Sequence, residues 1–184
     1  MEKKDLTAAE VWAMFAEIDR KIAENNEKLE RLIRLYDRKS NVDDIWSSNG
    51  EYDEDCFYNS LKRRMEFAGV HFDDICKNIK SAKKMPNGER LEDQFDIVML
   101  NDNAVALIEI EYTARENDLT TMVNQKVPNF RILVPDYANC KIYLGLGALS
   151  ISDEVAEEAK KLGIGLLRQV GETIEYETKW VRVY

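Results

Sequence analysis

Two apolar segments separated by three polar residues constrain the fold of this chain more than any other feature. The segments are QFDIVML (residues 94–100) and AVALIEIEY (residues 104–112), and Asn101-Asp102-Asn103 joins them. Apolar runs of this length around a tight polar turn predict a β-hairpin. Because both runs are almost continuously apolar, we expect other elements to cover both faces of the strands. The hairpin therefore predicts the interior of a sheet with helices on its faces.

The flanking segments predict the order α-β-β-β-α-β-α-β, which implies a mixed α/β sheet. Ser152 can cap a helix that Gly163 ends. Gly145-Leu146-Gly147 lacks the third glycine of a dinucleotide-binding turn, and we expect it to mark the exit from a strand into a loop. The expected elements are helix 51–68 (ended by Gly69), strand 70–80, the hairpin strands, helix 117–131, strand 140–147, helix 153–162, and strands 163–170 and 173–178.

The N-terminal segment, residues 7–38, predicts one long helix. Thr7 followed by Glu10 fits a capping box. Apolar residues recur at alternating spacings of four and three, as in a coiled-coil seam, and Asn25 interrupts the seam once. We expect self-association through this helix, most simply as a homodimer; the alternative is an amphipathic helix that packs on its own domain. The seam consists of Val11, Phe15, Ile18, Ile22, Asn25, Leu29, Leu32 and Tyr36.

These patterns predict three parts of the chain: a coiled-coil-type helix over residues 1–40, a linker over 41–50, and an α/β domain over 51–184. Residues 1–40 hold nine basic and nine acidic residues, so the whole net charge of −9 falls in residues 41–184. Nucleic-acid binders usually show a basic footprint. The charge balance therefore disfavours a tight nonspecific binder, although a local basic groove is compatible with it.

Composition also limits other classes of function. Cys56, Cys76 and Cys140 form no CxxC pair, and we expect reduced thiols rather than zinc ligands or disulfides. His71 is the single histidine, and we expect it to be structural. No apolar run approaches the roughly 18 residues of a membrane span, and no apolar segment follows the N-terminal lysines. We therefore expect a cytoplasmic protein without a membrane partner.

The hairpin carries the acids that bear on function. If Asp102-Asn103 forms a two-residue turn, Asp96 lies opposite Glu109, and Glu111 shares the face of Glu109. Burying neighbouring carboxylates is costly unless a cation or a shared proton relieves the repulsion. A hard divalent cation is one reason to gather them. The alternative is that the two glutamates lie near a strand end and contact water or a lysine.

The sequence FDIV followed by ALIEIEY resembles the D-x(n)-(D/E)-x-K core of the PD-(D/E)XK superfamily, which includes restriction endonucleases. The family core runs α-β-β-β-α-β, as expected here for residues 51–147, which predicts a restriction endonuclease-like fold. The chain is also similar to a bacterial, coiled-coil-bearing group of this superfamily whose function is unassigned. The resemblance covers most of the chain, and the element order carries more weight than the short motif.

The resemblance implies that Asp96 and Glu109 bind a divalent metal ion, Mg²⁺ or Mn²⁺, and that Glu54 on the preceding helix adds a further ligand. It implies a nuclease that hydrolyses phosphodiester bonds, with nucleic acid as its partner. The chain departs from the family pattern at Glu111, which stands at the position of the lysine that stabilises the transition state. Glutamate supplies no positive charge, but it can act as a base or hold a second metal ion.

Lys126, on the following helix, is the candidate for the displaced positive charge; the alternative is a solvated helix lysine. Three functions therefore stay open. The first is a metal-dependent nuclease with Asp96, Glu109, Glu111 and Lys126 as catalytic residues. The second is a noncatalytic descendant of the fold that acts as an oligomeric interaction protein. The third is a module that binds nucleic acid without cutting it.

Overall fold

The computed structural model describes residues 8–37, 50–171 and 173–184, and side chains for 14–28, 54–171 and 173–184. The chain divides into two compact units, Met1–Asp37 and Arg38–Tyr184. The first unit holds the long helix α1 (Ala8–Asp37), as the heptad pattern predicts. The predicted linker, residues 41–50, lies outside the described residues except for Gly50. No helix of the described residues is long and apolar enough to cross a membrane.

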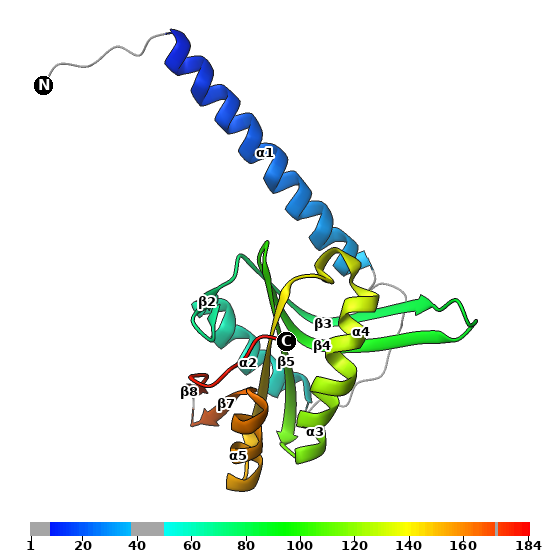
Figure 1. The fold of residues 1–184 in the computed structure, drawn as a ribbon. Coiled ribbons are helices and arrows are strands. Elements are labelled where there is room, and N and C mark those ends of the chain that lie inside the picture. The colour runs from blue at the N-terminus through cyan, green and yellow to red at the C-terminus, as the bar shows by residue number, and fades with distance from the viewer. Residues whose placement is uncertain (1–7, 38–49, 172) are drawn as a thin grey trace, which may run out of the picture. The chain divides into compact units, whose positions relative to one another are not determined.

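The second unit is built on a six-stranded mixed sheet in which every strand lies beside its neighbours in chain order (Figure 1). The first three strands pair with one another in antiparallel orientation. The third pairs with the fourth and the fourth with the fifth in parallel orientation, and the fifth pairs with the sixth in antiparallel orientation. The strands are β3 (Asp74–Lys84), β4 (Arg90–Leu100), β5 (Ala104–Thr113), β6 (Lys141–Ser150), β7 (Gly165–Val170) and β8 (Thr173–Glu177). The predicted mixed α/β fold class is confirmed.

Helices cover the sheet on two sides. Phe57 and Leu61 of α2 (Gly50–Arg64) pack in one core cluster with Ile97 and Met99 of β4. On the other side, Phe130 packs edge-on against Phe95, with ring centroids 5.2 Å apart. This second layer consists of α3 (Glu116–Thr121), the π-helical turn η2 (Met122–Lys126), α4 (Val127–Leu133), the short turn η3 (Pro135–Tyr137) and α5 (Asp153–Leu162). Coverage of both faces explains why β5 is almost continuously apolar.

The hairpin has the predicted register. Ile97 pairs with Ile108 and Leu100 with Val105, as a two-residue turn at Asp102-Asn103 requires. Asn101 fixes that turn, because its side-chain oxygen accepts hydrogen bonds from the backbone N–H groups of Asn103 (2.9 Å) and Ala104 (2.7 Å). Asparagine commonly stabilises turns through such local bonds.

Some element boundaries differ from the sequence-based expectation. α2 ends at Arg64 rather than before Gly69, because a small antiparallel hairpin, β1 (Glu66–Phe67) with β2 (Val70–His71), follows it. The single helix expected over residues 117–131 is divided into α3, η2 and α4. α5 has the predicted bounds: Ser152 accepts a hydrogen bond from the Val155 N–H, and Gly163 adopts the left-handed conformation at the end.

The prediction that Gly145 and Gly147 mark a strand exit is wrong, because both lie within β6. They are needed there for close packing. A Cβ atom on Gly145 would lie 2.8 Å from the ring of Phe67, and one on Gly147 would lie 2.6 Å from Ile110 and 3.1 Å from Phe57. The two glycines allow aromatic rings of the α2 side to pack against the backbone of β6.

We therefore expect Gly145→Ala to lower the free energy of unfolding by about 1–3 kcal/mol, since the buried Phe67 ring has no room to shift. Urea unfolding would measure the loss. In a Phe67→Leu background the same change should cost less, because leucine lacks the clashing ring atom. Equal costs in the two backgrounds would contradict the packing argument.

Candidate active site

Asp96 lies at an irregularity in the middle of the sheet. Phe95 faces α4, whereas Ile97, two residues on, packs with α2. Alternate residues of a regular strand point to the same face, so the alternation of β4 shifts at Asp96. On β3, Asn78 lies between the pairs Lys77–Ile97 and Ile79–Phe95 and has a φ of 55°. Asparagine tolerates a positive φ better than most residues. The irregularity places Asp96 at the point where the pairing of β4 with β5 ends.

The carboxylate of Asp96 replaces part of the strand pairing. Its Oδ2 accepts a hydrogen bond from the backbone N–H of Ile110 on β5, at 2.9 Å. Burial raises the pKa of Asp96 above its ordinary value, while the Ile110 N–H and the charge of Lys126 act in the opposite direction. The Ile110 bond fixes the orientation of a carboxylate that has lost most of its water.

Glu109, on β5, forms a buried ion pair with Lys126. Lys126 Nζ lies 2.8 Å from Glu109 Oε2 and 3.2 Å from Asp93 Oδ1, and it also donates to the backbone oxygen of Gln94. The Lys126 side chain is only 17% exposed, so the alternative of a solvated helix lysine is wrong.

Burial and the charge of Asp96 raise the pKa of Glu109 to about 8, although Lys126 opposes the shift. Burial lowers the pKa of Lys126, but the carboxylates of Glu109 and Asp93 outweigh it and raise that pKa overall. A proton on Glu109 would weaken its hold on Lys126. Asp93 also holds the lysine, so we take Lys126 as charged and Glu109 as the group that titrates.

The π-helical turn accounts for the position of Lys126. This residue ends η2, and α4 begins at Val127 with Pro128 in its first turn. Proline lacks the N–H that an uninterrupted helix would use, and π-turns occur frequently at functional sites. The sequence predicted one helix over residues 117–131, and it did not predict that a π-helical turn would bring Lys126 to the sheet.

Asp93 and Asn129 were missed by the sequence analysis. Asn129 Nδ2 donates to Asp93 Oδ2 at 2.8 Å, which leaves Asp93 Oδ1 for Lys126 and for the Gln94 N–H. Asp93 was overlooked because the strand was expected to begin at Gln94, whereas β4 begins at Arg90. A strand extended by a few residues would have included this acid.

Glu54 and Glu111 complete the acidic environment. Burial raises the pKa of Glu54 on α2, and a hydrogen bond to the Asn78 side chain opposes the shift. Burial, followed by the charge of Asp118, raises the pKa of Glu111. The charge of Asp96 contributes to the raised pKa of Glu54, Glu109 and Glu111 alike. These four acids therefore share one electrostatic environment.

The donor chemistry of this site fits a hard divalent cation. Glu109 Oε1 is buried and has no hydrogen-bond partner, which is costly for a carboxylate oxygen. Carboxylate oxygens are the ligands that Mg²⁺ prefers. The acids are not gathered into ligand geometry, since no three carboxylate, histidine or cysteine side chains among the described residues are arranged to hold a metal ion. Lys126 Nζ is the positive charge beside Glu109, at 2.8 Å from its Oε2.

Known structures that resemble this chain do so at low sequence identity. One, from Vibrio cholerae, is 17% identical over 65% of this chain and 30% of its own, with a TM-score of 0.47. A repair endonuclease from Pyrococcus abyssi is 16% identical over 70% of this chain and 49% of its own, with a TM-score of 0.41. The small subunit of a heterodimeric restriction endonuclease is 16% identical over 64% of this chain and 62% of its own, with a TM-score of 0.35.

The chain thus spans between 30% and 62% of the length of these proteins. No family model and no curated protein matches it. All three TM-scores are below 0.5, so the fold assignment rests on the topology of the sheet. The α-β-β-β-α-β order from α2 to β6, apart from the small β1–β2 hairpin, is that of the restriction endonuclease-like fold.

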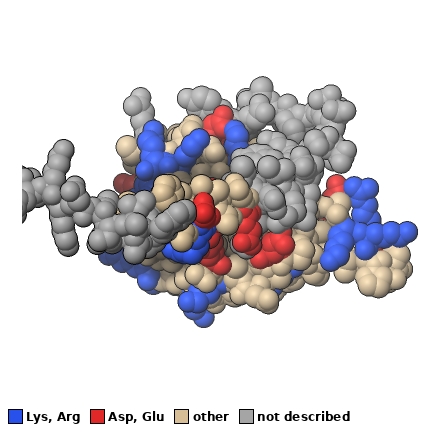
Figure 2. Space-filling view, turned by 90° about the horizontal axis from the view of Figure 1, so that it is seen from above, with Lys and Arg blue, Asp and Glu red and all other residues tan. Residues whose placement is uncertain are grey.

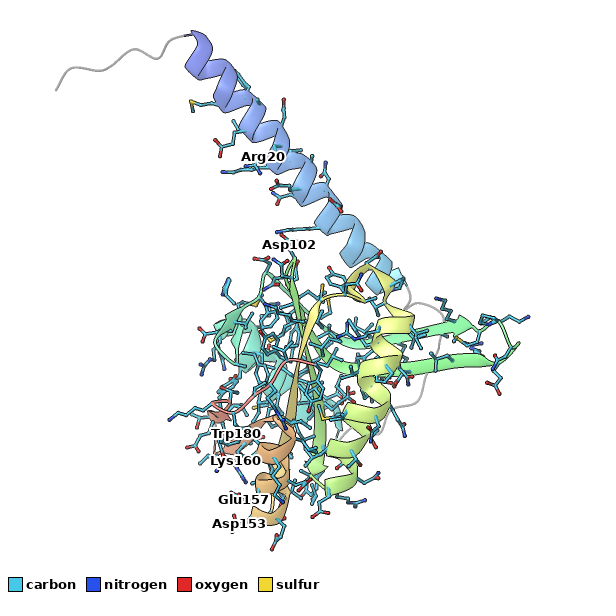
Figure 3. All side chains as sticks on the ribbon, in the orientation of Figure 1. Arg20, Asp102, Asp153, Glu157, Lys160 and Trp180 are labelled. Atoms are coloured by element: carbon cyan, nitrogen blue, oxygen red, sulfur yellow. The ribbon has the colours of Figure 1, made fainter. Side chains whose placement is uncertain are left out.

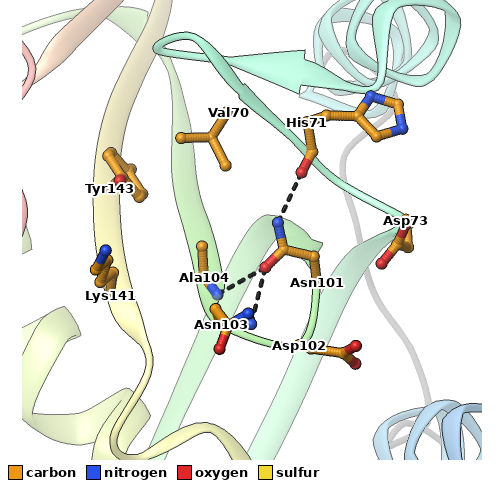
Figure 4. Close-up of a pocket in the computed structure, with 9 residues that line it drawn as sticks. All are labelled: Val70, His71, Asp73, Asn101, Asp102, Asn103, Ala104, Lys141 and Tyr143. Atoms are coloured by element: carbon orange, nitrogen blue, oxygen red, sulfur yellow. Dashed lines mark hydrogen bonds between the residues drawn. The ribbon is translucent and has the colours of Figure 1, made fainter.

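A cavity of about 340 Å³ lies at the other end of the hairpin, beside the turn (Figure 4). Asn101 lies at its edge, but its side chain is committed to the turn and to the backbone oxygen of His71, at 2.7 Å. None of the acids described above lines this cavity. It is lined by Val70, His71, Asp73, Asn101, Asp102, Asn103, Ala104, Lys141 and Tyr143.

The raised pKa of Glu109 predicts a pH-dependent stability. Between its ordinary value near 4.5 and about 8, the folded chain binds the proton on Glu109 more tightly than the unfolded chain does. Stability from this group therefore falls as the pH rises through that window. Glutamine has no such proton, so Glu109→Gln does not lose this part of its stability as the pH rises. Relative to the wild type, the free energy of unfolding of Glu109→Gln should therefore increase by about 2–4 kcal/mol from pH 5 to pH 8.

Urea unfolding at several pH values would measure this difference. Glu175→Gln provides a control, because Glu175 is exposed on β8. A difference between Glu109→Gln and wild type that stays constant with pH would contradict the assigned pKa.

Proposed function

We propose that this chain is a metal-dependent nuclease that hydrolyses phosphodiester bonds of nucleic acid at the site around Asp96 and Glu109. The observation that carries the proposal is the buried oxygen of Glu109 without a partner, in a carboxyl group whose pKa is about 8 beside the partly buried Lys126. Strongly perturbed acids with a cation partner are typical of catalytic sites. A carboxyl held in this state stores an unfavourable energy that a cation would relieve.

In this proposal Glu54, Asp96 and Glu109 hold Mg²⁺ or Mn²⁺. A bound divalent ion would polarise the phosphate and lower the pKa of a water ligand. The chain's own contribution begins with Glu109, which must lose its proton to bind a cation. Asp96 keeps its orientation through the Ile110 N–H. Glu54 approaches from α2, where its hydrogen bond to Asn78 links the helix to the irregular point of β3.

Lys126 and Glu111 take the remaining roles. Lys126 supplies the positive charge that Glu111 lacks, and it can move from the carboxylate of Glu109 to a phosphate oxygen. A buried ammonium group stabilises the negative charge that develops in phosphoryl transfer. Glu111 is more exposed than Glu109, and its raised pKa suits a group that accepts a proton from the attacking water.

A second function, an oligomeric interaction protein that has lost catalysis, is favoured by a specific feature of α1. The seam residues Ile18 and Ile22 are 48% and 52% exposed on this helix. Exposed apolar residues at heptad spacing are typical of a helix that pairs with a partner. We propose that α1 self-associates, and this holds for a catalytic or a noncatalytic chain.

The nuclease proposal predicts that Asp96→Asn abolishes metal binding with little loss of stability. Asparagine keeps the shape of the side chain and an oxygen for the Ile110 N–H, but it removes the negative charge. Calorimetric titration with Mn²⁺ would measure binding to the wild type and the variant. Asp102→Asn is the matched control, because Asp102 lies in the turn at the other end of the same hairpin (Figure 3).

Cleavage of plasmid and of single-stranded nucleic acid in Mg²⁺ or Mn²⁺ completes the test. Asp96→Asn should lose cleavage, and Lys126→Ala should lose it while metal binding persists. A wild type that binds no divalent metal would refute the proposed site. Metal binding unchanged by Asp96→Asn would place the ion elsewhere in the chain.

The α1 proposal predicts that Ile18→Glu with Ile22→Glu converts the chain to a monomer, because two positions that the proposed dimer buries would then carry charge. Sedimentation equilibrium would measure the mass. Arg20→Glu with Lys21→Glu is a control on polar positions, whose ion pairs with Glu24 and Glu17 are exposed and contribute little (Figure 3 labels Arg20). A monomeric wild type would exclude self-association.

A further inference from the structure

The ends of β3 and β4 form a two-stranded ribbon that projects beyond the helical layers (Figure 1). Pairing continues to Lys84 and Arg90, and the Met85 N–H donates to Glu89 O (2.8 Å) in the closing turn. Residues 80–90 hold four basic residues and one acidic residue, in a chain of net charge −9. Figure 2 shows Lys and Arg side chains gathered on this projection, beside Asp and Glu side chains in the middle of the same view. The ribbon is thus a basic element on a chain of net charge −9.

Two like charges lie directly opposite each other on the ribbon. Lys84 and Arg90 are cross-strand partners, and both side chains are exposed. Like charges in this arrangement destabilise a strand pair. Glu92 offsets part of the repulsion through an exposed pair with Arg90, at 3.1 Å. An anionic ligand would relieve the remaining repulsion.

The two faces of the ribbon differ in what they contact. Ser81 and Lys83 face α4, since their side chains donate to the backbone oxygens of Leu133 (3.4 Å) and Ile132 (3.5 Å). Lys84 follows Lys83 in the strand, so it lies on the opposite face, together with its partner Arg90. The side chains of Lys84 and Arg90 therefore lie on the face of the ribbon opposite to α4.

Strand β4 connects this pair to the candidate active site. Arg90 begins the strand and Asp96 lies six positions later, which corresponds to about 20 Å at 3.4 Å per residue. Along duplex DNA that distance is about six base pairs. A two-stranded ribbon also matches the width of the major groove of B-form DNA, whereas the major groove of A-form RNA is too narrow for side chains to read.

We propose that this ribbon is a contact arm for duplex DNA, in which Lys84 and Arg90 neutralise backbone phosphates about six base pairs from the acidic site. The inference rests on the proposed function, since it places the substrate of that site along β4. It also explains how a chain of net charge −9 contacts nucleic acid, because the ribbon supplies a local positive surface.

The test is fluorescence anisotropy with a labelled duplex of about two helical turns, in a buffer with EDTA so that binding is separated from cleavage. Lys84→Glu with Arg90→Glu should weaken binding by about tenfold or more. The slope of the logarithm of the binding constant against the logarithm of the salt concentration should fall by the equivalent of about two phosphate contacts. Lys160→Glu with Lys161→Glu on α5 changes the net charge equally, and it should have a much smaller effect (Figure 3 labels Lys160). Lys84→Arg with Arg90→Lys should retain binding.

Equal weakening by the ribbon variant and the α5 variant would overturn the proposal, because net charge alone would then explain the loss. A wild type that binds no duplex DNA at low salt would also overturn it, as would equally tight binding of double-stranded RNA through the same residues. Cleavage separates the two proposals. If the wild type cuts DNA and the ribbon variant binds and cuts equally well, the arm fails and the nuclease stands. If the arm binds DNA but no divalent metal supports cleavage, the arm stands and the nuclease fails.

Discussion

The buried pair between Glu109 and Lys126 connects the centre of the sheet to the helical layer that covers it. A carboxylate in an almost continuously apolar strand would be very costly without this lysine, and removing one partner of such a pair commonly costs about 3–5 kcal/mol. Lys126 ends the π-helical turn before Val127, and its Nζ lies 2.8 Å from Glu109 Oε2 on β5. The division of one helix into α3, η2 and α4 is therefore tied to the chemistry of the site.

A second constraint acts at Asp96, where side-chain alternation shifts on β4 and Asn78 adopts a positive φ on β3. Strand pairing lost at this point is replaced by the bond from the Ile110 N–H to the Asp96 carboxylate. Irregular backbone of this kind costs free energy, and it commonly occurs at functional sites. The result is that acids from α2, β4 and β5 act on one another electrically although they come from three elements.

The distribution of charge separates an acidic centre from a basic ribbon along the same strand. Burial raises the pKa of Glu54, Asp96 and Glu109; the charge of Asp96 adds to the shift of Glu54 and Glu109, and the charge of Asp93 adds to that of Asp96. The Lys84–Arg90 pair carries the opposite charge at the far end of β4. Global net charge is thus a poor guide to what this domain can bind, because a local positive surface persists on a chain whose sum is negative.

The sequence alone determined the hairpin, its register and the order of the main elements, because strand alternation, turn residues and helix caps act over a few neighbouring positions. It also predicted that Asp96 would pair with Glu109, but the pairing of β4 with β5 ends at Ile97 and Ile108, and Asp96 instead accepts a hydrogen bond from the Ile110 N–H. Only the tertiary structure decided that Lys126 would be buried against Glu109 and that Asp93 and Asn129 would support it. Those contacts join residues more than 15 positions apart through the packing of a π-turn against a sheet. Neither periodicity nor composition predicts that the Lys126 side chain points toward the sheet. The same holds for Gly145 and Gly147, whose role depends on aromatic rings that approach β6 from α2 and from the β1–β2 hairpin.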